Sequence, residues 1–421
     1  MTRGKRILVL TPQFPYPPNQ GTTIRNYNLI AGLARRHEVH LLSFGDPDVC
    51  AGSPLHEQCS SIRVVPTPRR TMRQRLSGLL FSRLPDMAQR LPSAEYSEAV
   101  SSALQETKPD VLEVEGIELA RYLLEAAAAR TGDAAQRVPL LVFDDHNTEY
   151  VLQQRAFETD LRNRNPRGWI GAAYSFVQWR RLRRYERHVC LTADRVVSVS
   201  DVDAQALREL VPGLEPVVVP NGVDVAFYTQ PTAPLSAVLG AAGEDLGRPG
   251  LVFTGKMDFR PNVDAVLWFV QEVLPLIRLD VPDALFWVVG KDPHRRLTAL
   301  AGHPAVRLTG RVEDVRPYIA SAAVYVVPLR IGGGTRLKVL EAMAMGKALV
   351  STSLGCEGFD LMPGRDLLVA DTPTDFAAAV VGLLGEPHRR EMLGSSAFRF
   401  AAALYDWSAL VPKLEAMYVN A

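Results

Sequence analysis

The chain has 421 residues, which is too long for one ordinary hydrophobic core, so we expect two domains. Hydrophobic residues make up 47% and charged residues 22%, as in ordinary globular proteins, and the net charge of +1 creates no overall field that favours nucleic acid. Four cysteines without a CxxC pair fit a reducing compartment, and no apolar stretch approaches the ~20 residues of a membrane span, so we expect a cytoplasmic protein.

Short apolar runs alternate with helical patterns through the first half of the chain. Helical spacing extends from Gly21 to Arg36. Buried-type strands are predicted at residues 6–12, 38–44, 61–66, 110–115, 139–145 and 195–200. Strands that alternate with helices in this way predict a parallel, doubly wound α/β sheet.

The same alternation begins again in the second half. Strands are predicted at residues 250–255, 284–290, 305–310, 323–329, 347–353 and 366–371. Two such halves predict two Rossmann-like domains that face a cleft, with ligands at the carboxyl ends of the strands. A turn signal in residues 217–224 places the boundary, so we expect domains at 1–218 and 219–400 and a final helix at 401–421.

Residues 328–358 contain the most informative motif of the chain. A buried-type strand is followed by a glycine loop and then by an apolar-periodic helix. The loop and first helical turn hold Gly332, Gly333, Gly334, Thr335, Arg336 and Lys338. A helix start offers free N–H groups, and glycines let a phosphate approach the backbone, so this order predicts an anion site for the diphosphate of a nucleotide. Glycines needed only for a tight turn are the alternative.

Glu341 is the single inward candidate acid on that helix. It lies three residues after Lys338, so the two side chains can pair on the helix surface. If Glu341 points into a cleft instead, its carboxylate would accept two hydroxyl groups, as a ribose offers. His146 lies at the end of the strand 139–145 and is either a sugar-contacting group or a packing histidine. Asp144 and Asp145 beside it either orient the imidazole or cap the next helix.

Two bare DxD patterns raise the question of a metal site. Asp46 and Asp48 follow a strand in a proline-containing turn, whereas Asp201 begins a helix ahead of Asp203 and suits an N-cap. Both positions favour a structural role. We therefore predict no metal ligands.

Two basic stretches stand out in the first half. Residues 69–90 hold six arginines against one aspartate, and residues 155–187 hold nine arginines against three acids. A solvated helix face is the favoured interpretation. The alternative is peripheral contact with an anionic membrane surface or acceptor lipid, because Leu76, Leu79, Leu80 and Phe81 permit amphipathic docking. Nucleic acid is least favoured, since no aromatic stacking platform accompanies the charge.

Together these motifs resemble glycosyltransferase family 4, which has the GT-B fold. The resemblance covers essentially the full chain and rests on PNGVD (220–224), FTGKMDFRPN (253–262), residues 308–329, LEAMAMGKALVSTSLGCEG (340–358) and the Gly21 loop. It implies a hexosyltransferase that moves a sugar from a nucleotide-diphosphate sugar to an acceptor hydroxyl with retention. The acceptor would be a glycan, a lipid-linked group or a small molecule, in polysaccharide or glycoconjugate synthesis, with no metal or other cofactor.

The resemblance also implies roles for individual residues. The first domain would bind the acceptor and the second the nucleotide sugar, with the final helix crossing back to the first. Glu341 would hold the ribose and His146 the transferred sugar. Lys256, Arg260 and Lys338 would bind the phosphates, Gly21 would open a loop over the donor phosphate, and Arg311 lies in the stretch that contains the base-contacting loop.

One departure from the family pattern concerns the glycine loop. Many members have two glutamates separated by seven residues, and the second corresponds to Glu341. The first would fall at Gly333, as in a subset with a GGGTRLK-type loop. Backbone N–H groups around Gly333 and Gly334 would then serve the sugar or the phosphate.

Three other functions are alternatives to this one. A GT-B nucleotide-sugar epimerase would need further acids and histidines in the cleft, and few are found. A non-catalytic nucleotide-sugar or glycan-binding partner stays open because of the missing glutamate. A nicotinamide-dependent dehydrogenase is disfavoured, since no GxGxxG follows the first strand.

Overall fold

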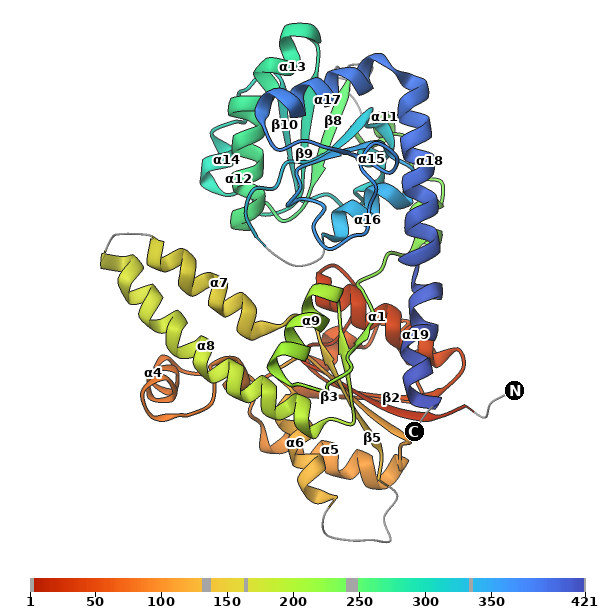
Figure 1. Ribbon diagram of the computed structural model, residues 1–421. Helices are drawn as coiled ribbons and strands as arrows, with labels where there is room; N and C mark the ends of the chain where they lie inside the picture. Colours follow the sequence, from red (N-terminus) through yellow and green to blue (C-terminus); the bar gives the residue numbers. More distant parts are fainter. Residues whose placement is uncertain (1–3, 131–137, 163–165, 240–248, 333–335, 420–421) are drawn as a thin grey trace. The chain divides into compact units, whose positions relative to one another are not determined.

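The computed structural model describes residues 4–130, 138–162, 166–239, 249–332 and 336–419. The chain forms two compact units (Figure 1). Unit 1 contains Met1–Asn221 together with Leu410–Ala421, and unit 2 contains Gly222–Ala409. The divisions lie at 221/222 and 409/410, beside the expected 218/219 and 400/401.

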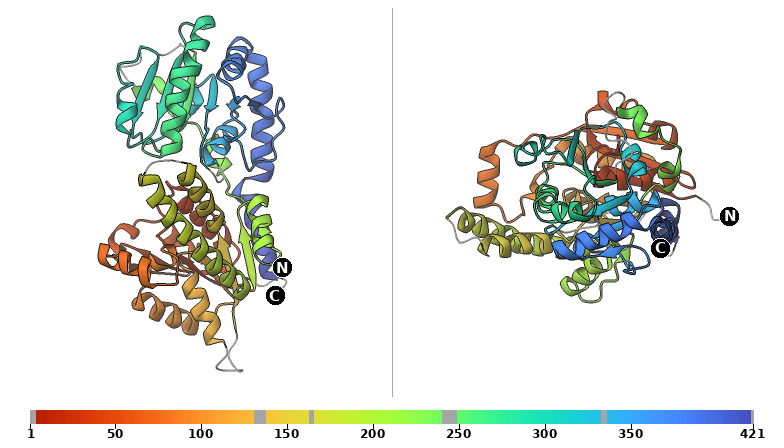
Figure 2. Two further views of the ribbon diagram at one scale, coloured as in Figure 1. Left: turned by 60° about the vertical axis from the view of Figure 1, so that its left-hand side comes forward. Right: turned by 90° about the horizontal axis from the view of Figure 1, so that it is seen from above.

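Unit 1 is built on a seven-stranded parallel sheet in the order β3-β2-β1-β4-β5-β6-β7. Its strands are β1 (Arg6–Thr11), β2 (Glu38–Gly45), β3 (Ser61–Pro66), β4 (Val111–Glu115), β5 (Leu140–Asp145), β6 (Arg195–Ser198) and β7 (Val217–Val218). Its main helices are α1 (Gly21–Ala34), α2 (Pro47–Cys50), α3 (Leu55–Gln58), α4 (Met72–Phe81), α5 (Ala94–Thr107), α6 (Ala120–Ala129), α7 (Glu149–Arg162), α8 (Pro166–Thr192) and α9 (Asp201–Leu210). The predicted doubly wound sheet is confirmed (Figure 2).

The two faces of this sheet differ in polarity, because successive side chains of a strand point to opposite faces. One face is apolar: Phe44 and Phe143 belong to a core cluster with Tyr96 of α5 and Tyr122 of α6. The other face holds buried polar side chains of β4 and β5, and α1 supplies a partner for them. This second face positions the site of unit 1.

Unit 2 is built on a six-stranded parallel sheet in the order β10-β9-β8-β11-β12-β13. Its strands are β8 (Gly250–Thr254), β9 (Leu285–Val289), β10 (Val306–Gly310), β11 (Val324–Val327), β12 (Leu349–Ser351) and β13 (Leu368–Val369). Its helices are α10 (Val225–Thr229), α11 (Leu235–Leu239), α12 (Arg260–Trp268), α13 (Leu274–Asp280), α14 (Arg295–Thr298), α15 (Arg316–Ser321), α16 (Leu337–Ala344), α17 (Pro373–Gly385) and α18 (Pro387–Leu404).

The ends of β8 and β9 approach each other too closely for a side chain. Gly290 has φ +153°, and a Cβ there would lie 1.7 Å from the carbonyl oxygen of Gly255. Glycine is therefore required at position 290. This close approach shapes the carboxyl edge of the sheet, where the second candidate site lies.

The last helix, α19 (Trp407–Val419), belongs to unit 1 from Leu410 onward. The hydroxyl of Tyr418 donates to Glu113 Oε2 of β4 at 2.5 Å, and Lys5 donates to the backbone carbonyl of Tyr418. Residues at the end of the chain are thus fastened to the sheet of unit 1.

The DxD patterns have local structural roles. The Asp46 carboxylate accepts the N–H of Asp48 at 3.1 Å and caps α2. The N-cap of α9 is Ser200, whose hydroxyl accepts the N–H of Asp203 at 3.1 Å, so the prediction of Asp201 as the cap is wrong by one residue. Within the described part of the chain, no helix combines the length and the apolar character needed to cross a membrane.

Candidate functional site

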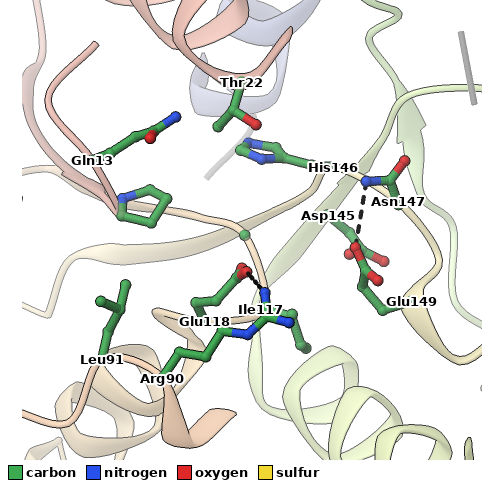
Figure 3. A pocket seen from close by; sticks show the side chains of 12 residues that line it. Gln13, Thr22, Arg90, Leu91, Ile117, Glu118, Asp145, His146, Asn147 and Glu149 are labelled. Carbon is green, nitrogen blue, oxygen red and sulfur yellow. Dashed lines mark hydrogen bonds and ion pairs between the residues drawn. The ribbon is translucent and has the colours of Figure 1, made fainter. Parts of the chain in front are cut away.

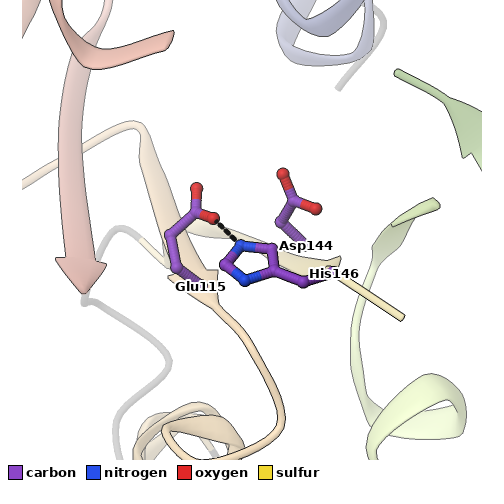
Figure 4. A group of neighbouring side chains, drawn as sticks. All are labelled: Glu115, Asp144 and His146. Atoms are coloured by element: carbon purple, nitrogen blue, oxygen red, sulfur yellow. Dashed lines mark hydrogen bonds and ion pairs between the residues drawn. The ribbon is translucent and has the colours of Figure 1, made fainter. Parts of the chain in front are cut away.

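Unit 1 has a polar cluster around His146 (Figure 4). Glu115 ends β4 and lies directly opposite Asp144 of the neighbouring strand β5. His146 follows β5, and its Nε2 lies 2.5 Å from Glu115 Oε2. Parallel neighbouring strands end at the same edge of a sheet, which is why these three side chains meet.

Burial sets the protonation of this pair. It lowers the pKa of His146, because a charged imidazolium is poorly solvated there. Burial, with a further contribution from Asp144, raises the pKa of Glu115 well above its ordinary value. Both shifts favour the uncharged forms of the two groups, which are joined by the hydrogen bond.

Arg25 of α1 is a residue of this cluster that the sequence did not reveal. Its side chain is 1% exposed, and its Nε and a terminal nitrogen donate to Asp144 Oδ2 at 3.2 and 2.7 Å. The other terminal nitrogen donates to the carbonyl of Val219 at 2.8 Å. Asp144 is thus engaged by Arg25, and Glu115 takes the position beside His146 that we had predicted for Asp144 or Asp145.

Glu115, Asp144 and His146 each offer an atom within 4.8 Å of the others, a spacing that a metal ion can use. The Arg25 guanidinium, however, already supplies the positive charge beside Asp144. A divalent ion would add a second cation against it. The charge arrangement thus favours a hydrogen-bonded cluster over a metal centre.

Asp145 points to the opposite face of the sheet and meets Glu186 of α8. Burial and the neighbouring Glu186 raise the pKa of Asp145 well above its ordinary value, and burial raises that of Glu186 to about 8. Two buried carboxyls in contact share a proton. Glu186 also accepts the N–H groups of Glu149 and Tyr150 at 2.9 and 3.0 Å, so Glu186, and not the predicted Asp144 or Asp145, caps α7.

A cavity of about 280 Å³ opens beside His146 (Figure 3). It is lined by Pro12, Gln13, Thr22, Arg90, Leu91, Gly116, Ile117, Glu118, Asp145, His146, Asn147 and Glu149. Gly21, expected to open the first helix, is the first residue of α1, directly before Thr22. The cavity lies at the carboxyl edge of the sheet, as expected for a ligand site of this fold class.

Unit 2 has a second polar cluster at the start of α16. Lys338 Nζ donates to Asn262 Oδ1 at 2.8 Å and lies 3.9 Å from the ring centroid of Phe253. Asn262, at the start of α12, also donates to the carbonyl of Lys256 at 2.9 Å. Burial lowers the pKa of Lys338 to about 7, while the nearby Glu341 acts in the opposite direction.

Glu341 lies one turn further along α16. Burial raises its pKa, while Lys338 and a hydrogen bond with the Tyr228 hydroxyl act in the opposite direction. Tyr228 belongs to α10, more than 100 residues earlier in the chain. Nothing in the sequence indicates this partner, because a tyrosine in a short helix after a turn is an ordinary packing residue.

The other predicted donor residues fall into three groups. Gly332 (φ +112°) lies against buried Arg336: a Cβ there would stand 3.4 Å from the guanidinium, and burial lowers the pKa of Arg336. Gly333, Gly334 and Thr335 lie outside the described residues.

Lys256, Arg260 and Arg311 are exposed. Lys256 pairs with Asp258 at 3.1 Å. The structure thus brings Lys338 and Glu341 together in a half-buried cluster and leaves the three exposed cations at the surface.

Two family models match most of the chain. The model described as Glycosyltransferase Family 4 matches residues 20–227, and the model described as Glycosyl transferases group 1 matches residues 248–386. The chain belongs to the family 4 glycosyltransferases, as the sequence motifs predicted.

Curated relatives agree with this assignment. The chain is 30% identical over 228 residues to a phosphatidyl-myo-inositol mannosyltransferase of Mycolicibacterium smegmatis, an alignment that covers 53% of this chain and only 56% of that protein. It is 21% identical over 416 residues to an uncharacterized 44.6 kDa protein in the cps region of Klebsiella pneumoniae, covering 95% and 96% of the two chains.

Solved structures establish the GT-B fold. Sucrose-phosphate synthase from Thermosynechococcus elongatus matches with a TM-score of 0.69 at 19% identity, covering 99% of this chain and 98% of that chain. Anabaena HepE, solved in complex with UDP-glucose, matches with a TM-score of 0.64 at 14% identity, covering 99% and 100%.

The first prediction concerns the buried Arg25–Asp144 pair. Arg25→Met should lower the free energy of unfolding by about 3–5 kcal/mol, because it leaves a buried carboxylate without its cation. The double variant Arg25→Met/Asp144→Leu should recover much of that loss, since both charges are gone. Arg121→Met removes an exposed pair with Glu125 and should change stability by less than about 1 kcal/mol. Urea-induced unfolding measures all three, and equal midpoints for Arg25→Met and Arg121→Met would contradict the argument.

Proposed function

We propose that the protein transfers a sugar from a nucleotide-diphosphate sugar to an acceptor hydroxyl with retention of configuration. The observation that carries this proposal is the half-buried cluster of Lys338 and Glu341 directly after a glycine loop. Lys338 is desolvated and lacks a carboxylate hydrogen-bond partner, so an anionic diphosphate would restore its full charge. The UDP-glucose complex of a protein with the same fold supports this type of donor.

The chemistry follows from charge that develops on the leaving group. When the bond to the sugar breaks, the nucleotide diphosphate gains negative charge, which Lys338 and the N-terminus of α16 stabilise. Arg336 at the start of α16 adds a second cation, and Lys256 and Arg260 provide exposed ones. These groups supply the stabilisation that a metal gives in other enzymes, so we propose a reaction without a metal or other cofactor.

Residue roles follow from placement. Glu341, held by Tyr228, accepts two ribose hydroxyls. In unit 1, Glu115 holds the imidazole of His146, and we assign His146 to contact with the transferred sugar. The donor diphosphate itself takes the proton of the acceptor hydroxyl as the bond to the sugar breaks. We assign donor binding to unit 2 and acceptor binding to unit 1.

Glu341 provides the direct test of the donor site. Glu341→Gln should raise the KM for the nucleotide sugar roughly 10–100-fold, because hydrogen bonds to a charged group contribute about 1.5–3 kcal/mol. Glu272→Gln, an exposed acid of the same unit, should behave like the wild type. Transfer and hydrolysis are measured over a panel of nucleotide sugars. If none is turned over, the enzyme proposal fails, and a donor that binds without turnover would favour a non-catalytic binding partner.

The lowered pKa of Lys338 predicts that the protein takes up a proton when it binds a nucleoside diphosphate. Its folded-state pKa of about 7 lies below the ordinary 10.5, so between these values the folded protein holds fewer protons than the unfolded chain. The contribution of Lys338 to stability is therefore full above pH 10.5 and is lost as the pH falls through 7. At pH 8 a bound nucleoside diphosphate should return the proton to Lys338.

Calorimetry in two buffers of different ionisation enthalpy measures this uptake. We expect close to one proton taken up by the wild type and by Lys413→Met, an exposed control. Lys338→Met should bind more weakly and take up none. Equal uptake by the wild type and Lys338→Met would show that another group titrates.

A peripheral membrane contact is a further part of the proposal. Phe81 and Met72 of α4 are 85% and 68% exposed, and exposed Arg73 and Arg75 lie on the same helix. Arg181 of α8 donates to the carbonyls of Gly78 and Leu79, so α4 packs against α8, whose exposed face holds further arginines. Exposed apolar side chains beside cations favour an anionic lipid surface.

Vesicle co-sedimentation at low salt tests this contact. The wild type should sediment with vesicles that contain anionic lipid, and Met72→Ser/Phe81→Ser should reduce the partition coefficient at least about tenfold, since each buried side chain contributes ~1.5–3 kcal/mol. Leu279→Ser removes a 78%-exposed leucine from unit 2 and should change nothing. Absence of wild-type sedimentation would remove the membrane contact.

A further inference from the structure

The cavity beside His146 has a lining that restricts the chemistry of its ligand. At about 280 Å³ it lies just below the ~300–1,000 Å³ range of small-molecule sites, so it fits one ring-sized group. Three lining side chains, Pro12, Leu91 and Ile117, are apolar. Most of the others can donate or accept hydrogen bonds. A ring with C–H faces and a rim of hydroxyl groups matches such a mixed lining.

The cations of the lining are already compensated. Arg90 is the single arginine or lysine among the twelve lining residues. Its guanidinium lies 3.4 Å from Glu118 Oε1 and 3.9 Å from Asp86 Oδ2. His146 adds no positive charge, because burial lowers its pKa. A phosphate entering the cavity would therefore find no uncompensated cation.

The acids of the lining oppose an anion directly. Glu118 and Glu149 both line the cavity (Figure 3). Burial, reinforced by Glu118, raises the pKa of Glu149 to about 7, so Glu149 is ionised at pH 8. Because Arg90 and Glu118 compensate each other, Glu149 is the main source of repulsion, and like charges at short range are unfavourable. The lining thus excludes anionic groups rather than binding them.

The accessible acceptors of the lining point to hydroxyl groups as the ligand. Gln13, Glu118 and Glu149 each bring a side-chain oxygen to the lining. Asp145 is also a lining residue, but both of its carboxylate oxygens are buried and out of a ligand's reach. Gly116 keeps the space beside Glu118 and His146 open, since a Cβ there would stand 3.3 Å from Glu118 and 3.6 Å from His146 Nδ1. A ligand hydroxyl can donate to carboxylate and amide oxygens, whereas a phosphate dianion cannot.

We infer that this cavity binds an uncharged, polyhydroxylated ring of the acceptor, a sugar or a cyclic polyol, and excludes rings that bear a phosphate or a carboxylate. The inference rests on the proposed function, in that the bound ring is taken to be the acceptor. It predicts that molecules whose ring itself is phosphorylated are not acceptors for this protein.

Binding of matched ring pairs tests the inference. Methyl hexosides and myo-inositol are each compared with their monophosphates on the full chain at pH 8, with and without a nucleoside diphosphate. Titration monitored by ligand NMR measures the dissociation constants. We expect at least one neutral ring to bind and its monophosphate to bind at least about tenfold more weakly.

Two variants test whether Glu118 contributes to the weaker binding of the phosphorylated ring. Glu118→Gln removes one negative charge and frees Arg90. The ratio of the dissociation constants of the monophosphate and the neutral ring should therefore shrink at least about threefold. Glu98→Gln, an exposed acid of the same unit away from the cavity, should preserve it. The inference is overturned if the monophosphate binds as well as the neutral ring, if Glu118→Gln leaves the difference unchanged, or if no neutral ring binds. Failure of the proposed function is distinct: neutral rings would bind while no nucleotide sugar is turned over.

Discussion

The buried pair of Arg25 and Asp144 is the interaction on which the site of unit 1 depends. Arg25 joins α1 to β5, and it also donates to the carbonyl of Val219, two residues before the end of the first segment of unit 1. Arg25 engages Oδ2 of Asp144, and Glu115 holds His146. A buried charge needs a partner with good geometry, so this one contact determines the orientation of helix, strand and imidazole together.

Asp144 and Asp145 at the end of β5 are two buried carboxyls whose negative charge is compensated in different ways. Neighbouring residues of β5 face opposite sides of the sheet, and both are fully buried carboxyls. On one side an arginine neutralises the charge, whereas on the other a shared proton with Glu186 removes it. The second solution brings no cation to the cavity, so the lining suits hydroxyl groups better than phosphate.

The site of unit 2 has the opposite electrostatic character. Lys338 packs against a neutral amide and an aromatic ring, and its desolvation disfavours the charged form. An anion relieves that cost, and Glu341 nearby supplies an acceptor for hydroxyl groups. The two clusters thus divide the chemistry of the proposed reaction: one attracts a diphosphate, and the other accepts an uncharged ring.

The sequence by itself determined the doubly wound sheets, the carboxyl edges at which sites form, and the helix start that places Lys338 and Glu341, because these follow from local periodicity and from glycines before a helix. Only the tertiary structure decided the partners. Arg25 and Asp144 are 119 residues apart, and Tyr418 and Glu113 are 305 apart. Periodicity indicates that a side chain is turned inward but not which residue it meets, and a buried arginine in a helix looks like a solvated one. Hence the partners of Arg25, Tyr228 and Glu186 could be identified only from the tertiary structure.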